Sequence, residues 1–243
     1  MKFNREKWKN WEHRKPCPFC HDGLLLPQDG MYLQEETKNS KDNHAIGNHQ
    51  TDEFYFTGFL KCSNCKESAI ISGVRTQLNF QDEDGEYRNY YDSISIFPPP
   101  RIIQLPKTCP KEVKESLESS FALFWVENES CANKIRTSIE MLLDNLGVPR
   151  ERLSNNGKTI HLSLGKRIEE EVNNIHPEIS APMKAIKWIG NAGSHGSSLT
   201  IDDVLDAYEI LEQVLLTLYD KSKEELKEKI DKINNTCSPI SKH

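Results

Sequence analysis

The segment Phe97-Pro98-Pro99-Pro100-Arg101-Ile102-Ile103-Gln104-Leu105-Pro106 divides the chain into two parts with different hydrophobic patterns. Proline fixes φ and disfavours helix in the residue before it, so this run predicts a stiff, extended connection. Before it, the pattern is that of β-strands; after it, apolar residues recur with a period of roughly 3.6, as in α-helices. We therefore predict an α+β protein whose two domains are joined by residues 98–109.

On the N-terminal side, segments rich in β-branched and aromatic residues predict strands over 54–60, 69–74 and 87–97. Two Cys-x-x-Cys pairs accompany them, and each forms the tight turn typical of a zinc knuckle. Four thiolates in two knuckles complete a tetrahedral zinc site with no open position, so the metal is expected to stabilise the fold without taking part in chemistry. The predicted ligands are Cys17, Cys20, Cys62 and Cys65. Four free cysteines or a redox pair are the alternative.

Residues 1–97 are therefore predicted to form a zinc-ribbon-like β module preceded by a short helix that carries Trp8 and Trp11. The polar run from Lys38 to Asp52 predicts an exposed insertion loop between the two knuckles. The histidines near the knuckles are expected to be solvated loop residues, although each is an alternative metal ligand: His21, His44 and His49.

On the C-terminal side, the periodicity predicts an all-α bundle over residues 110–220 and a charged helical extension with a tail over 221–243. The second helix is expected to begin at a Ser130 cap and to stop at Gly147, and residues 150–158 are expected to form a loop. The other helices are predicted over 110–127, 163–174 and 179–189, and from a cap at Thr200 onward.

The stretch from Lys187 to Gly196 places a cation, Asn191 and His195 among glycines and serines, which predicts that the backbone bends or is approached closely before the last helix. Histidine titrates near neutrality, which suits proton transfer or phosphate binding. Arg136 and Glu140 lie four residues apart on one helix and point the same way.

The patterns Ala132-x-x-x-Arg136-x-x-x-Glu140 and Gly190-Asn191-x-x-x-His195, behind a knuckle-containing module, resemble a bacterial HEPN-like family of unknown function. That family is often found with restriction-type systems, and the resemblance covers roughly residues 95–220. The HEPN superfamily consists of helical bundles, and many members are metal-independent ribonucleases that combine two copies of their motif in a homodimer. The motif is Arg, a polar residue, three further residues and His.

The resemblance implies a toxin or antiphage ribonuclease in which His195 transfers protons, Asn191 orients the phosphate, and Lys187 or Arg136 with Glu140 supplies the neutralising cation. Gly190 stands at the position of the motif arginine, and Lys187 occupies a position three before the Gly-Asn pair that is often basic. Losing a cation beside a scissile phosphate costs orders of magnitude in rate. The alternative is therefore a non-catalytic module that binds nucleotide, nucleic acid or a partner protein of a defence system.

Structural roles are also open for these residues. Asn191 and His195 can cap the turn and the final helix, Arg136 and Glu140 can form a surface pair worth about 0.3–0.5 kcal/mol, and Trp188 is expected in a core or an interface. The formal charge of −6 argues against binding nucleic acid by bulk charge. The N-terminus has no signal-peptide pattern and no apolar run approaches a membrane span, so we expect a cytoplasmic protein without membrane contact.

Overall fold

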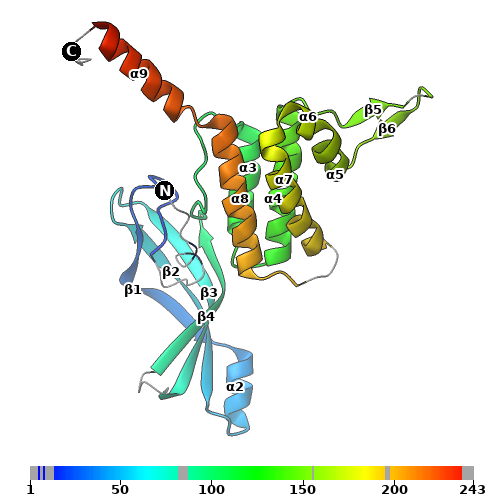
Figure 1. Cartoon of the computed structure of the whole chain (residues 1–243). Coiled ribbons are helices and arrows are strands. Elements are labelled where there is room, and N and C mark those ends of the chain that lie inside the picture. Colours follow the sequence, from blue (N-terminus) through cyan, green and yellow to red (C-terminus); the bar gives the residue numbers. More distant parts are fainter. Residues whose placement is uncertain are drawn as a thin grey trace.

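The computed structural model describes residues 5, 8, 14–81, 87–154, 156–194 and 198–236. Its N-terminal half is a four-stranded antiparallel sheet and its C-terminal half is a set of helices (Figure 1). The last strand of the sheet ends at Phe97 and the first long helix begins at Lys111, so the change from sheet to helices falls in the proline-rich segment. Among the described residues, no helix combines the length and the apolarity needed to cross a bilayer.

The sheet has the order β1 (Leu25–Glu36), β2 (Thr51–Cys62), β3 (Ser68–Gln81), β4 (Tyr87–Phe97). Neighbouring strands are consecutive in the chain and pair antiparallel. Buried and exposed side chains alternate along the second half of β2, because successive residues of a strand point to opposite faces. The buried face holds a core made of Leu25, Phe56, Leu60, Ala69, Ile71, Ile94 and Ile96.

The prediction of a loop between Lys38 and Asp52 was wrong, because residues Lys38–Ala45 form helix α2. Thr37 caps this helix by accepting a hydrogen bond from Ser40 N (3.2 Å). His44, expected to be solvated, lies between two carboxylates, with Nδ1 3.2 Å from Glu36 and Nε2 2.7 Å from Asp52. These polar contacts hold the helix against the sheet although it offers almost no apolar surface.

The long helices of the C-terminal half are α3 (Lys111–Leu123), α4 (Asn128–Asn145), α7 (Pro177–Ser194) and α8 (Ile201–Tyr219). α4 packs against α3 and α7, and α7 packs against α8 (Figure 1). The predicted Thr200 cap is confirmed as a capping box with Asp203. The predicted Ser130 cap was wrong: α4 begins earlier, and its cap is Glu127, which accepts a hydrogen bond from Ser130 N.

Two further expectations in this half needed correction. Residues 150–158 were predicted to be a loop, but β5 (Glu151–Leu153) and β6 (Thr159–His161) form a hairpin that projects from the bundle (Figure 1). The predicted helix over 163–174 consists of α5 (Leu164–Lys166), a π-helical turn η1 (Arg167–Val172) and α6 (Asn173–Ile175). The buried Arg167 inside that turn donates to Asp144 and to Val148 O, both at 2.8 Å.

The charged extension is helix α9 (Ser222–Thr236), which points away from the bundle (Figure 1). The N-terminal end of the chain contributes to the helical half, because Trp8 is buried in its core beside Phe124 and Trp125. Trp125 Nε1 donates to Trp8 O (3.0 Å), and Trp125 also packs on the core of the sheet. The two halves are therefore in contact around this tryptophan pair.

Candidate functional site

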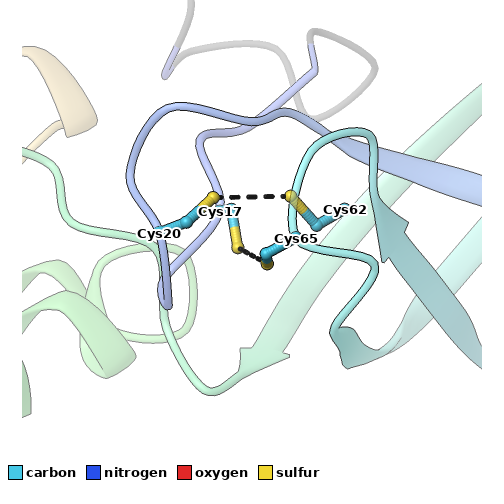
Figure 2. A group of neighbouring side chains, drawn as sticks. All are labelled: Cys17, Cys20, Cys62 and Cys65. Carbon is cyan, nitrogen blue, oxygen red and sulfur yellow. Dashed lines mark hydrogen bonds between the residues drawn. The ribbon is translucent and has the colours of Figure 1, made fainter.

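The four cysteines of the two Cys-x-x-Cys pairs converge, as their spacing predicts (Figure 2). Their sulfur atoms all lie within 4.8 Å of one another, and no disulfide joins them. The Sγ–Sγ distances from Cys17 to Cys65 and from Cys20 to Cys62 are both 3.7 Å. Each of these distances joins one knuckle to the other.

The two knuckles share one backbone conformation. His21 and Lys66, the residues directly after each pair, both have positive φ (61° and 65°). Phe19 N donates to Cys17 Sγ (3.4 Å), and Asn64 N donates to Cys62 Sγ (3.3 Å). These N–H groups stabilise negative charge on sulfur, and thiolates are the form in which cysteine binds metal.

Gly23 is required beside the cluster, because a Cβ there would clash with Cys62 Sγ and lie 2.8 Å from Asn64 Cβ. Backbone N–H groups of Gly23 and Asp22 lower the pKa of Cys20 to about 6. Bonds of about 2.3 Å from a tetrahedral metal to four sulfurs require S–S separations of about 3.8 Å. The donor set and its spacing therefore fit a metal held by four thiolates, and His21, which follows the first pair, is no part of the cluster.

The stretch from Lys187 to Ser194 belongs to helix α7, so the expected bend does not occur in this part of it, whereas the alternative, a close approach to the backbone, is found at Gly190. His195 lies outside the described residues. Leu199, just before α8, is hydrogen-bonded to the N-terminus of α4. Asn128 Nδ2 donates to Leu199 O, and Leu199 N donates to Glu129 Oε1, both at 3.0 Å. This contact ties the segment that follows α7 to the end of α4.

Gly190 is a point of close contact between α7 and α4. A Cβ built on Gly190 would lie 2.9 Å from Arg136 Cβ, 3.2 Å from Arg136 Cδ and 3.4 Å from Ala132 O. An L side chain at 190 has no room unless α4 moves. The close contact with α4 therefore accounts for a glycine at this position, and the stem of the Arg136 side chain lies directly against it.

Arg136 and Glu140 form the predicted pair, with Nη2 3.4 Å from Oε1. The Arg136 side chain is 31% exposed, yet its Nε is buried and has no hydrogen-bond partner among the described residues. A buried guanidinium N–H without a partner is costly. Arg136 is therefore a partly exposed cation whose aliphatic stem lies against Gly190 and whose buried Nε has no partner among the described residues.

Lys187 is buried (8% exposed), and no ion pair or hydrogen bond to it is found in the described part of the chain. Its Nζ lies 3.6 Å from the ring centroid of Trp188 and close to Gly165 of α5. Trp188 is 57% exposed and belongs to neither core, so of the two expected places, a core or an interface, the core is wrong. Asn191 stands one turn after Lys187 and is partly buried. Arg136 of α4, paired with Glu140, thus lies beside Gly190 of α7, and Lys187 and Asn191 stand within one turn of Gly190 on the same helix.

Substituting Gly190 is expected to separate α7 from α4. Gly190→Leu should lower the free energy of unfolding by about 2 kcal/mol, since overfilling a packed contact costs about 1–3 kcal/mol. Gly190→Ala should cost less, because alanine gains about 1 kcal/mol over glycine inside a helix. Urea unfolding followed by circular dichroism measures both. A Gly190→Leu variant as stable as the unchanged chain would contradict the close contact.

Comparison with known proteins gives two matches, one in each half of the chain. A domain of unknown function, DUF8608, matches residues 1–100, and a second domain of unknown function, DUF4145, matches residues 118–236. No curated protein and no solved structure matches the chain. Each match covers one half of the architecture, so the sheet with its cysteine cluster and the helices with the Gly190 contact are separately similar to uncharacterised domains.

Proposed function

We propose that the helical half is a HEPN-like domain that cleaves RNA without a catalytic metal, and that the cysteine cluster holds a structural zinc. The observation that supports cleavage is the position of Arg136. The side chain of Arg136 lies beside Gly190, the position at which the resembling motif carries its arginine, and it is partly exposed, so its positive charge can act on a phosphate there. The role proposed is that of a toxin or antiphage effector acting as a homodimer in the cytoplasm.

In this proposal, each polar residue near Gly190 has one task. His195 removes the proton of the ribose 2′-OH or returns one to the leaving 5′-oxygen. Asn191 orients the phosphate, while Arg136 and Lys187 neutralise the charge that develops on its oxygens. Glu140 holds the Arg136 guanidinium in place through their ion pair.

Zinc is the metal proposed for the cluster, because Zn²⁺ in structural sites takes four ligands in a tetrahedral arrangement and binds soft ligands such as thiolates. With four protein ligands, no coordination position is left for a substrate or a water. The zinc would therefore stabilise the loops at the end of the sheet and leave the chemistry to the helical half.

The test is cleavage of tRNA and total RNA by the purified full chain, in comparison with Arg136→Gln. The variant should cleave about 10²–10³-fold more slowly, the usual cost of removing one group that stabilises transition-state charge. Arg101→Gln is the matched control, because Arg101 is also partly exposed and paired with a glutamate (Glu118, 2.7 Å). Equal cleavage by the Arg136→Gln variant and the unchanged chain would overturn the assignment.

The second candidate is a module that binds a nucleotide or nucleic acid without cleaving it. The packing of Gly190 favours it, because α4 leaves no space for the arginine that the motif carries at that position. It predicts saturable binding of RNA with no turnover, and the cleavage assay distinguishes the two candidates directly.

A further inference from the structure

The exposed indole of Trp188 is the feature of α7 that neither folding nor the proposed proton transfers require. In contrast to Trp188, three large apolar residues of the same helix face the core and are almost fully buried: Ile179, Met183 and Ile186. Trp188 is 57% exposed and is the only tryptophan of the described residues among the exposed large hydrophobic side chains. An exposed tryptophan on a rigid helix presents a flat apolar surface to solvent at no benefit to the core.

Two polar residues of α7 next to Trp188, Lys187 and Asn191, form no ion pair or side-chain hydrogen bond with the residues that the structure describes. Asn191 lies three residues further on, and the Lys187 ammonium lies 3.6 Å from the centre of the ring. Residues three apart on a helix are surface neighbours, so the aromatic face, the cation and the amide form one patch. Asn191 makes no side-chain hydrogen bond with the residues that the structure describes.

The charged side chains around this patch sum to a net positive charge. Lys184, one turn before Trp188, is neutralised by Glu169 (3.0 Å), and Arg136 is paired with Glu140. Both lysines lower the pKa of Glu169, Lys184 through its hydrogen bond and Lys187 through its charge. Within the described part of the chain, Lys187 therefore remains as the cation without a carboxylate of its own.

We infer that Lys187, Trp188 and Asn191 bind one unpaired nucleotide of single-stranded RNA, with the base stacked on the exposed indole of Trp188 and a phosphate attracted by the charge of the buried Lys187 ammonium beside the ring. A base stacked on an aromatic side chain is stabilised whatever its sequence, because every base has a π-face, and a neighbouring cation holds the backbone. Bases in a duplex have their faces covered by stacking, so this arrangement selects single strands. The inference rests on the proposed function and names its substrate class.

The local character of the patch agrees with the charge of the whole chain. A protein with a formal charge of −6 does not attract RNA over its whole surface. Binding through one stacked base and one or two phosphates needs only the local cations. We therefore expect a shallower salt dependence than that of a basic RNA-binding protein.

The test is binding of a 5′-phosphorylated hexa-adenylate RNA to the full chain, measured by isothermal titration, with the fully base-paired RNA duplex for comparison. Trp188→Ala should weaken binding of the single strand about tenfold or more, whereas Trp188→Phe should retain most of it. Lys187→Met, which keeps the buried stem, should weaken binding by a similar factor. Lys184→Gln is the control and should bind as the unchanged chain does.

The outcomes separate this inference from the proposed ribonuclease activity. If the unchanged chain binds the hexamer and Trp188→Ala does not, while neither cleaves RNA, the subsite stands and the ribonuclease assignment fails. If RNA is cleaved but Trp188→Ala binds the hexamer with unchanged affinity, or if duplex binds as well as single strand, the subsite is overturned. Circular dichroism confirms folding; Trp188 is largely exposed, so its replacement should leave the bundle intact.

Discussion

Replacing Cys62 with serine is expected to abolish zinc binding and to unfold the loops that join the strands. Cys62 is buried at the end of β2, pairs in register with Leu25 of β1, and lies 3.7 Å from Cys20 across the cluster. Structural zinc contributes about 10–16 kcal/mol in small zinc domains, as much as the whole stability of a typical protein. The sheet has a core of its own, so we expect a fall in Tm of at least about 10 °C, a change of several kcal/mol in a chain of this size.

Zinc content per chain, measured by mass spectrometry, and thermal unfolding with and without a chelator test this prediction. The chelator should reproduce the effect of the substitution on the unchanged chain and have no effect on the Cys62→Ser variant. Cys109→Ser is the matched control, because Cys109 is also buried but lies outside the cluster. Stoichiometric zinc in Cys62→Ser, or a chelator without influence on Tm, would show that the cluster is not a structural zinc site.

The cysteine cluster could be predicted from the sequence because each knuckle is local: two residues separate the thiols, and the turn follows from that spacing. The strand β1 was missed, since Pro27 and Gly30 interrupt its pattern and alternation is absent. Helix α2 was missed because it is almost wholly polar, and its stability comes from Thr37 and from carboxylates on neighbouring strands. Such contacts join residues only three to eight apart, but they are polar and therefore leave no apolar periodicity in the sequence.

The polar residues around Gly190 could be selected from the sequence, but their arrangement could not. Glycines and serines predicted either a bend or a close approach to the backbone, and the structure shows the second, because Gly190 is helical and permits α4 to approach. Only the pairing of two helices shows that Arg136 fills the space beside it. The exposure of Trp188 is likewise a property of the packed bundle, because a tryptophan next to apolar residues gives the same pattern whether it faces the core or solvent.

His195→Ala is expected to lower the rate of RNA cleavage by about 10²–10⁴-fold, the usual contribution of a general acid or base. This prediction follows from the resemblance and from the contacts of the segments that precede and follow His195 in the chain. α7 ends at Ser194, and Leu199 is held by Asn128 and Glu129, so only a short segment carrying His195 separates two anchored points. Single-turnover cleavage of tRNA measures the rate; His161→Ala, an exposed histidine of the hairpin, is the control.

Binding and cleavage should respond separately in this variant. His195→Ala should bind the hexa-adenylate as the unchanged chain does, because the proposed base and phosphate contacts are made by Trp188 and Lys187.

The proposed homodimer adds a second requirement. If each site combines residues of two copies, a mixture of His195→Ala and Arg136→Gln chains should regain cleavage, because one mixed site then carries both functional side chains. Two inactive variants that stay inactive when mixed would contradict a shared site, and unchanged cleavage by His195→Ala alone would contradict the ribonuclease assignment itself.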